Sequence, residues 1–400
     1  MIQKKYSYID FVLSLSPWGM KMGRDNLIKI LWYLWSPQDT LQVFHVTGSN
    51  WKWSVCQMLS QVLYKKFKKK VGLFTSPHLI DITERFQVNW ESITYYELNK
   101  YYKRALSLSK KYAIELSFFE IQVLVMVMYF CDQKVDYAVI EVWLGGLYDG
   151  TNIFKKTLAC FITSITLEHT HVLGKNRKTI LRNKLGILKP WTTLYTHIHT
   201  LQVREYCRKI GAKLRICTLD VEEEKLTNLP WKHQQKNAVL VLESLRDIGY
   251  NSKKIKDALK NIYHPGRNEW ISPHLFVDSA NNYENIILLK RMLKNTLNDA
   301  IIIFGSTQTD PVYVAKLANI FPNQKKILVD GFCERSLPCS QYSHFVPSST
   351  TKHLDTDIWK KFIKNLSKPC PWTQKYILFG SIYLVGYVMR LSRYKIFANK

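Results

Sequence analysis

Residues 41–54, LQVFHVTGSNWKWS, contain the pattern that decides the fold of this 400-residue chain. The run Leu41 to Val46 is short, apolar and rich in β-branched residues, which predicts a buried strand. The polar loop Thr47-Gly48-Ser49-Asn50 follows it, and a helical pattern then continues through Phe67. A strand, a loop and a helix in this order are typical of a phosphate-binding unit.

The loop has part of the composition that phosphate binding needs. Glycines allow backbone N–H groups to turn toward phosphate oxygens, while a lysine and a Ser or Thr serve the phosphate and magnesium. Gly48, Lys52 and Ser54 supply these groups. Trp51 and Trp53 oppose this interpretation, because an indole fits poorly where glycine serves and would fill the phosphate space. Taken alone, the loop leaves a purely structural turn open as the alternative.

The alternation of strands and helices continues along the chain. Further strands are predicted at Val71–Phe74 and Asp136–Val142, a buried helix at Phe118–Cys131, and a strand-like run at Phe161 to Leu167. With the alternation continuing through Ile216, we expect an α/β domain whose parallel sheet is covered on both faces.

A second alternation begins after His264-Pro265-Gly266-Arg267, where the Pro-Gly pair predicts a domain boundary. The length of the chain also favours two domains, which we place at residues 1–264 and 265–400. The strands expected in the second domain are Leu275–Val277, Ala300–Phe304, Lys326–Val329 and Tyr376–Phe379.

The composition is that of a folded, strongly basic protein. Hydrophobic residues make up 46% of the chain and aromatic residues 13%, which argues against disorder. The net charge of +26 is compatible with nucleic acid, a membrane surface or an acidic ligand. The lysines are scattered, however, and the densest run, Lys65 to Lys70, lies where a helix should end and cations suit the helix dipole. We therefore expect no nucleic-acid partner.

Cysteine usage and hydropathy predict a cytoplasmic protein. The eight cysteines include no C-x-x-C pair and no zinc-binding spacing. The longest apolar run, Ile121 to Cys131, is too short to span a bilayer. Asp10 interrupts the N-terminal apolar stretch, which predicts a first helix and no signal peptide. We expect a monomer without a membrane partner.

An ordered series of short motifs accompanies the loop, and in register it is specific. From about Tyr8 to Arg390 it resembles the folylpolyglutamate synthase/dihydrofolate synthase family of the Mur ligase superfamily. The motifs are Thr75-Ser76-Pro77-His78-Leu79, Glu84-Arg85-Phe86, Phe118-Phe119-Glu120, Glu141-Val142-Trp143-Leu144-Gly145-Gly146, Asp149-Gly150-Thr151-Asn152, Thr163-Ser164-Ile165, Glu168-His169-Thr170, Lys184-Leu185-Gly186-Ile187, Lys189-Pro190, His233-Gln234, Asn237-Ala238, Pro265-Gly266-Arg267 and Gly380-Ser381-Ile382-Tyr383-Leu384-Val385-Gly386.

The resemblance implies a central P-loop-type Mur ligase domain with a parallel sheet and a smaller, Rossmann-like C-terminal domain. It implies an ATP-dependent ligase that phosphorylates a carboxylate of a pteroate or folate, after which the amine of L-glutamate attacks the acyl phosphate. ATP and Mg²⁺ are the cofactors of such a reaction, since magnesium offsets phosphate charge. Whether dihydropteroate, a reduced folate or both are substrates stays open.

The resemblance also implies site roles for matching positions of this chain. Catalytic roles fall on Lys52, which would hold the transferred phosphate, on His169, and on Lys184, which matches a lysine that is carbamylated. The nucleotide contacts are Gly48, Ser49, Asn50, Lys52, Ser54, Asn237, Arg267 and Asp278. The magnesium ligands are Ser54, Ser76, Glu141 and His169. By residue type alone, Glu141 could make a structural hydrogen bond, His169 could be a satisfied polar residue, and Lys184 a solvated helix residue.

Some positions depart from the family pattern. Glu168 replaces an aspartate, Leu147 an arginine, Ser279 a glycine and Asn281 a histidine, and a lysine is replaced near Gln308. These changes weaken the case for full activity, so a catalytically inactive relative is the first alternative. A basic nucleic-acid-binding protein is a more distant one, and it predicts strongly salt-dependent binding.

Tryptophan stands at seven positions where the family pattern has glycine. Random decay would scatter glycine losses over many residue types, whereas a one-to-one exchange indicates a decoding difference. We hypothesise that a codon such as UGA is read as glycine in the source organism and was rendered as tryptophan. The seven, from twelve tryptophans in all, are Trp35, Trp51, Trp53, Trp90, Trp143, Trp191 and Trp231.

Overall fold

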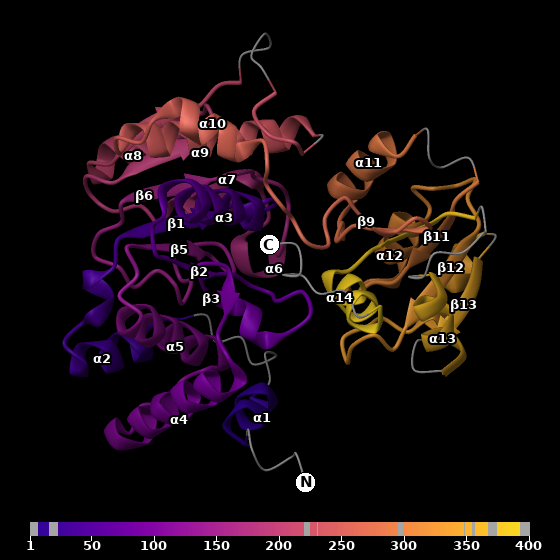
Figure 1. The fold of residues 1–400 in the computed structure, drawn as a ribbon, viewed down its shortest axis with the longest axis horizontal. Coiled ribbons are helices and arrows are strands. Elements are labelled where there is room, and N and C mark those ends of the chain that lie inside the picture. The colour runs from indigo at the N-terminus through magenta and orange to yellow at the C-terminus, as the bar shows by residue number, and fades with distance from the viewer. Residues whose placement is uncertain are drawn as a thin grey trace. The chain divides into compact units, whose positions relative to one another are not determined.

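Helices and strands alternate in two separate units of the computed structural model. The structure describes residues 7–15, 23–219, 225–229, 231–294, 299–347, 349–353, 357–366 and 374–392. Residues 1–78 and 82–263 form the first unit, and residues 79–81 and 264–400 form the second. Figure 1 shows the elements of each. In the ranges described, no helix is long and apolar enough to cross a membrane.

The first unit is built on an eight-stranded sheet with the order β4-β3-β2-β5-β1-β6-β7-β8. The strands from β2 to β8 across this order are parallel, whereas β3 and β4 form an antiparallel hairpin at one edge. The parallel part was predicted and the hairpin was not. The strands are β1 (Val43–Thr47), β2 (Val71–Phe74), β3 (Phe86–Val88), β4 (Glu91–Ser92), β5 (Tyr137–Glu141), β6 (Ala159–Ile162), β7 (Thr193–Thr196) and β8 (Lys213–Ile216).

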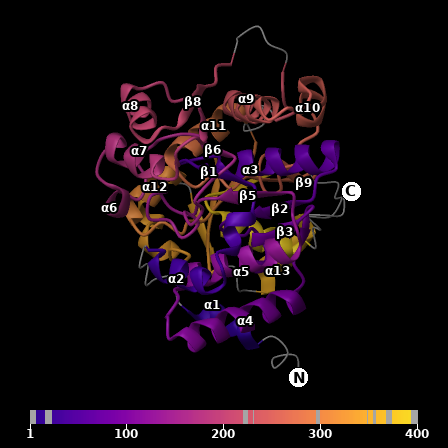
Figure 2. The same cartoon turned by 90° about the vertical axis from the view of Figure 1, so that its left-hand side faces the viewer.

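Helices cover both faces of this sheet, as Figures 1 and 2 show. One face packs against α3 (Lys52–Gln61), the π-helical turn η2 (Val62–Lys66), α9 (Lys232–Asp247) and α10 (Ser252–Leu259). The other packs against α1 (Ser7–Ser14), α2 (Asp25–Tyr33), α4 (Tyr95–Tyr112) and α5 (Phe118–Asp132). The remaining elements are η1 (Pro37–Thr40), η3 (Ile82–Arg85), α6 (Thr170–Leu173), α7 (Arg177–Leu185) and α8 (Leu201–Ile210).

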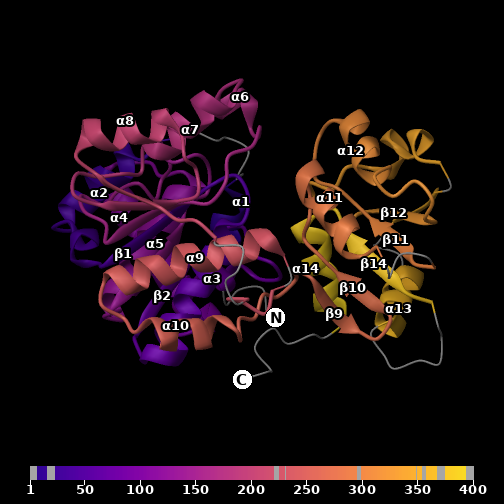
Figure 3. The same cartoon turned by 90° about the horizontal axis from the view of Figure 1, so that it is seen from above.

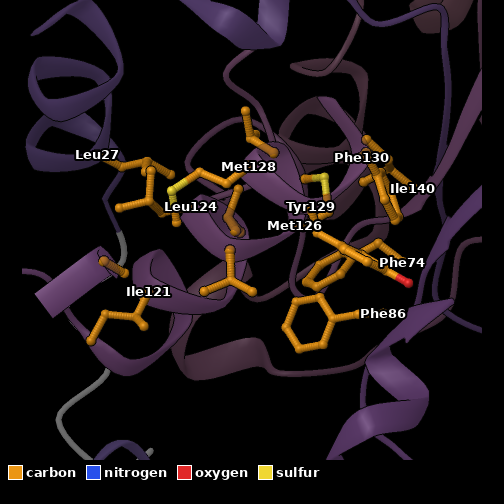
Figure 4. Close-up of a cluster of buried hydrophobic side chains, with 14 of the residues drawn as sticks. Leu27, Phe74, Phe86, Ile121, Leu124, Met126, Met128, Tyr129, Phe130 and Ile140 are labelled. Atoms are coloured by element: carbon orange, nitrogen blue, oxygen red, sulfur yellow. The ribbon is translucent and has the colours of Figure 1, made fainter. Parts of the chain in front are cut away.

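Helix α5 is the centre of one core cluster. Ser117 begins it with a capping box, in which its hydroxyl accepts from Glu120 N at 3.3 Å and Glu120 Oε2 accepts from Ser117 N at 2.9 Å. Apolar side chains cover the helix on all sides, as expected for a buried helix. Figure 4 shows Leu124 and Phe130 of α5 among the buried side chains of neighbouring elements, including Phe74 and Phe86.

The second unit has a six-stranded sheet with the order β13-β12-β11-β14-β10-β9, parallel except for β9 (Figure 3). All four predicted strands are present, and β9 and β13 were not predicted. The strands are β9 (Glu269–Ser272), β10 (Leu275–Val277), β11 (Ile301–Phe304), β12 (Lys326–Asp330), β13 (Ser349–His353) and β14 (Tyr376–Phe379). The helices are α11 (Tyr283–Met292), α12 (Pro311–Ala318), η4 (Cys339–Gln341), η5 (Ser343–Phe345), α13 (Asp357–Leu366) and α14 (Ile382–Leu391).

The run Phe161 to Leu167 was predicted to be strand-like, but strand β6 ends at Ile162. The prediction was therefore wrong for residues 163–167. Thr163 and Ser164 leave the sheet because their polar groups bond the loop that follows β1. Thr163 Oγ1 donates to Asn50 O at 2.6 Å, and Ser164 O accepts from Ser49 N at 2.8 Å. Hydrogen bonds to this loop therefore take the place of further sheet pairing.

Four of the seven anomalous tryptophans adopt a left-handed backbone. Their φ angles are 63° at Trp35, 66° at Trp51, 70° at Trp90 and 67° at Trp191. L-residues with a Cβ rarely adopt this conformation, and glycine adopts it freely. These positions therefore favour glycine for a reason that lies in the backbone itself. The other three tryptophans do not share this conformation.

The local structure explains two of these angles. Asn89 and Trp90, with φ of 53° and 70°, form the two-residue turn between β3 and β4. Such a turn needs a positive φ at both residues, and Asn-Gly is its preferred sequence. Trp35 follows the C-terminal end of α2, where Ser36 N donates back to Leu31 O at 2.8 Å. Glycine is the preferred residue at that position too.

Candidate active site

The loop between β1 and α3 is held by the chain segment that follows β6. Ser49 N donates to Ser164 O at 2.8 Å, and Asn50 N donates to Ser164 Oγ at 3.0 Å. Ser49 Oγ also accepts from Thr166 N at 3.0 Å. These bonds fix the loop at the carboxyl ends of two adjacent parallel strands, β1 and β6, where ligands bind in open α/β sheets.

Gly48 and Lys52 are arranged as a phosphate loop requires. Gly48 has φ of 152°, and a Cβ there would lie 1.8 Å from Thr163 Oγ1, so no larger residue fits. Lys52, the first residue of α3, folds its side chain back so that Nζ donates to Gly48 O at 3.0 Å. The lysine cation and the positive end of the α3 dipole therefore lie at the same loop.

Trp51 lies between these two residues and stacks on a histidine. Its ring centroid is 4.2 Å from that of His233, with 13° between the planes. Trp231 contacts the same imidazole edge-on, with centroids 4.7 Å apart. Because both indoles stand at family-glycine positions, the sequence as written has bulky rings at the start of α3, where a phosphate loop would present N–H groups.

Ser54 and Asn237 meet through a glutamine. Gln234 Nε2 of α9 donates to Ser54 Oγ at 3.1 Å, and Asn237 Nδ2 donates to Gln234 Oε1 at 3.0 Å. All three side chains are buried. Gln234 therefore links two predicted nucleotide contacts that lie 183 positions apart in the sequence, from 54 to 237. Its position in the His233-Gln234 motif was the available signal, but no role was predicted for it.

Ser76 and Glu141 lie at the carboxyl ends of two neighbouring parallel strands. Ser76 lies just after β2, Glu141 ends β5, and Ser76 N donates to Glu141 Oε2 at 3.0 Å. Both side chains are buried. Ser76 Oγ is buried and has no hydrogen-bond partner within the described residues, so this oxygen can accept a ligand. Hydroxyl and carboxylate oxygens are ligands that Mg²⁺ accepts.

Lys184 and Glu168 form a buried ion pair. Lys184 Nζ lies 2.7 Å from Glu168 Oε1, and the lysine side chain is 1% exposed. Burial lowers the pKa of Lys184 to about 8, although Glu168 acts to raise it. Burial acts to raise the pKa of Glu168, but Lys184 and Lys52 outweigh it and hold that pKa below its usual range. Lys184 is thus no solvated helix residue, and the glutamate at 168 is its direct partner.

His169 begins the short helix α6 with a left-handed φ of 44°. Burial lowers its pKa, and the Lys52 and Lys184 cations act in the same direction against Glu168. His169 is therefore close enough to Lys52, Glu168 and Lys184 for their charges to affect its pKa. The described ranges contain no group of three or more His, Cys, Asp or Glu side chains suited to a metal ion. The ligand roles predicted for Ser54, Ser76, Glu141 and His169 stay predictions.

Arg267 and Asp278 lie together in the second unit. Asp278 is fully buried, and its carboxylate accepts from Asn268 N at 2.8 Å and Ala280 N at 2.7 Å. Burial raises the pKa of Asp278, while the nearby Arg267 cation acts to lower it. The carboxylate therefore has a structural role in ordering the turn after β10, and its contact with nucleotide stays a prediction.

No protein-family model matches the chain. The dihydrofolate synthetase of Saccharomyces cerevisiae is 30% identical over 221 residues, which cover 53% of this chain and 52% of that protein. The dihydrofolate synthase/folylpolyglutamate synthase of Bacillus subtilis is 28% identical over 337 residues, which cover 74% of this chain and 77% of that protein. The crystal structure of the bifunctional folylpolyglutamate synthase/dihydrofolate synthase of Yersinia pestis, complexed with AMPPNP and a Mn ion, has a TM-score of 0.81 and 21% identity over 97% of each chain.

These likenesses differ in what they establish. At 21% identity the structural match concerns the fold, and it confirms the predicted two-domain Mur ligase architecture. The chain spans about half the length of the yeast relative, or 52%. The sequence matches are to the same family that the motif series indicated. In sequence and in fold, the chain is similar to folylpolyglutamate synthases and dihydrofolate synthases.

Proposed function

We propose that this protein is an ATP-dependent ligase that joins L-glutamate to dihydropteroate, to folates, or to both. The observation that carries the proposal is the arrangement around the loop after β1. Lys52 lies over Gly48, the Lys184–Glu168 pair is within electrostatic reach of Lys52, and Ser76 is bonded to Glu141. A cation for phosphate and buried oxygens for a metal are what an acyl-phosphate ligase requires.

In this proposal the loop binds ATP, and Gly48, Ser49, Asn50, Lys52, Ser54 and Asn237 contact it in the first unit. Lys52 holds the transferred phosphate, because its ammonium already lies over the loop backbone. Arg267 and Asp278 contribute nucleotide contacts from the second unit. We assign residues 1–264 to ATP binding and residues 265–400 to the side that handles glutamate.

The described residues fit magnesium. Ser76 Oγ is a buried oxygen without a partner in the described chain, and the Glu141 carboxylate is held beside it. We propose that these two side chains hold the ion together with Ser54 and His169, whose lowered pKa keeps the imidazole neutral and able to ligate. When bound, the ion supplies positive charge that offsets the charge of the phosphate groups.

The reaction itself tests this proposal. Native protein, in which the decoding hypothesis places glycine at the seven tryptophan positions, should release ADP and phosphate only when magnesium, ATP, L-glutamate and a pteroate-type or folate carboxylate are all present. The product should contain a new amide bond, which mass spectrometry detects. A protein that binds nucleotide but joins glutamate to neither dihydropteroate nor folates would instead be a catalytically inactive relative.

Carbamylation of Lys184 is expected to depend on pH. The neutral amine attacks carbon dioxide, forming an N–C bond and releasing a proton. With its pKa lowered to about 8, Lys184 becomes largely neutral above that pH, whereas an ordinary lysine stays charged. With ¹³C-labelled carbon dioxide held constant, the carbamate NMR signal should rise as the pH passes through about 8.

Two variants decide whether that signal belongs to Lys184. Lys184→Arg should remove it. Glu168→Gln should move its rise to lower pH, because the carboxylate acts to raise the pKa of the lysine. A signal that survives Lys184→Arg, or a Glu168→Gln rise at higher pH, contradicts the assignment.

We further propose a cytoplasmic monomer whose partners are its small-molecule substrates and which binds no nucleic acid. The cysteines in the described ranges all carry free thiols, which is consistent with a reducing compartment. Salt-independent sedimentation as a single chain in the presence of DNA or RNA checks the monomer and the absence of a nucleic-acid partner together.

A further inference from the structure

Arg24 contacts a loop that is far from it in sequence. It is the residue before α2, and its Nη1 donates to the carbonyl oxygen of Leu147, 123 residues away. The start of α2 is itself fixed, because Leu27 N donates to the buried carboxylate of Glu120 at 3.2 Å. The guanidinium of Arg24 is therefore held at the loop by a helix that is anchored on α5.

A second cation lies at the same loop. Asn152 Nδ2 donates to Leu147 O at 3.1 Å, the oxygen that Arg24 also binds. Asn152 Oδ1 in turn accepts from Lys189 Nζ at 2.8 Å. One asparagine thus separates the two cations, and the proximity of Arg24 adds to burial in lowering the pKa of Lys189.

Neither cation has an acidic partner among the residues that the structure describes. Among the described residues, the ion pairs of the chain include neither Arg24 nor Lys189. Both side chains are partly buried. Two like charges held close together and partly out of water are costly unless an anion joins them. Most of their hydrogen-bond donors are also unused, since each residue makes a single side-chain hydrogen bond within the described chain.

Arg24 lies at the loop position where this chain lacks an arginine of the family pattern. The family pattern has an arginine at position 147, and this chain has Leu147 there. Arg24 brings a guanidinium to the backbone of that same residue from another part of the chain. The positive charge is thereby retained at the loop although the residue that carries it has changed.

We propose that Arg24 and Lys189 form a binding site for a carboxylate of the pteroate-type or folate substrate, with Arg24 replacing the arginine that the family pattern has at position 147. This proposal rests on the proposed function. The phosphate groups of ATP already have Lys52 and the loop after β1, and L-glutamate is assigned to residues 265–400. The pteroate-type or folate carboxylate is therefore the anion that remains for this second pair. A guanidinium can bind a carboxylate through two parallel hydrogen bonds, and Lys189 adds a point charge.

The test compares two ligands by equilibrium dialysis against the purified full chain. The ligands are pteroate and the same pteridine–aminobenzene compound without its carboxylate. The wild-type chain should bind pteroate at least about tenfold more tightly, which is a usual effect of a charge-assisted hydrogen-bond pair. Arg24→Leu and Lys189→Met should each reduce that preference to about threefold or less. Arg208→Leu removes an exposed arginine of α8 from the same unit and should leave the preference unchanged.

The double variant Arg24→Leu/Leu147→Arg separates binding from packing. If the charge binds substrate, the new guanidinium at position 147 should restore the preference for pteroate. If Arg24 only holds the Leu147 carbonyl, the double variant should stay as weak as Arg24→Leu, and the proposal is overturned. Equal binding of both ligands by the wild-type chain overturns this site alone, whereas binding of neither overturns the proposed function with it. If Arg24→Leu does not fold, Lys189→Met decides: a lost preference for pteroate supports the site, and an unchanged preference overturns it.

Discussion

Replacing all seven anomalous tryptophans with glycine is expected to restore ATP binding and raise the unfolding temperature in the same protein. Trp51 and Trp53 flank Lys52 in the phosphate loop, and Trp51 holds a left-handed backbone with its ring stacked on His233. The sequence as written should therefore bind ATP poorly or not at all, because bulky rings stand where backbone N–H groups must approach phosphate. Isothermal titration with ATP and magnesium measures the first effect, and thermal unfolding the second.

The gain in stability should differ between positions. Trp35 and Trp191 are 94% and 83% exposed, so replacing them with glycine loses little packing. Each replacement should raise the free energy of unfolding by about 1–2 kcal/mol, because it removes the strain of a left-handed backbone. Trp90 is different, because its ring is buried and Nε1 donates to Ser60 Oγ at 3.1 Å. Glycine at 90 relieves the turn but removes those contacts, so its net effect should be the smallest of the three.

Trp32 provides the matched control. It lies three residues before Trp35, is 68% exposed, and belongs to the last turn of α2 with no left-handed backbone. Trp32→Gly should lower stability by up to about 1 kcal/mol, since glycine has a low helix propensity. Opposite signs for Trp32→Gly and Trp35→Gly would show that backbone conformation, and not removal of an exposed indole, causes the gain.

Peptide masses of the native protein test the decoding hypothesis directly. Peptides covering positions 51 and 53 should carry the masses of glycine at both. Tryptophan masses at these positions would refute the hypothesis and indicate a degenerate relative of these synthases. In that case the glycine variants would still report on strain, but not on the natural protein.

Loss of the proposed metal ligands is expected to abolish turnover while the fold remains. Glu141→Ala and His169→Ala should each reduce kcat by at least about 100-fold. Without the bound ion, the transition state would lose several kcal/mol of stabilisation of its phosphate charge. Lys52→Ala should act on phosphate transfer to a similar extent. Thermal unfolding should change far less than for a core truncation, since none of these side chains fills the apolar clusters.

Controls make this result specific to the site. Glu141→Gln keeps the shape and removes the charge, so it should be as inactive as Glu141→Ala if the carboxylate binds a metal. Glu205→Ala removes an exposed carboxylate of α8 and should leave kcat unchanged. Chelation of magnesium should silence the unmodified enzyme in the same assay. Near-native rates for the Glu141, His169 and Lys52 variants together would show the site assignment to be wrong even where the family resemblance holds.

The sequence alone predicted elements whose signal is local. The β1 strand, its loop and α3 follow from a short apolar run, a glycine and a helical pattern, and α5 from an apolar run of helical length. The hairpin of β3 and β4 was missed because its turn reads Asn89-Trp90. An Asn-Gly turn is among the strongest short-range signals in a sequence, and the tryptophan conceals it.

The site partners that escaped prediction are distant in sequence. Lys184 Nζ meets Glu168 only because α7 packs beside the segment after β6, and Glu168 had been noted only as a departure from aspartate. Arg24 contacts a backbone oxygen 123 residues away, which no pattern within a window of residues encodes. Backbone contacts of this kind depend on tertiary packing, so they became visible only with the fold.

The hydrogen bonds that hold the phosphate loop also set an order of events during synthesis of the protein. Asn50 N is bonded to Ser164 Oγ, 114 residues further along the chain. A growing polypeptide that has emerged from the ribosome only through α5 contains the whole loop but none of the residues that fix its shape. Nucleotide affinity should therefore not appear before β6 has paired with β1 and residues 163–166 have reached the loop. Ribosome-bound chains of increasing length, probed with a labelled ATP analogue, would time that step.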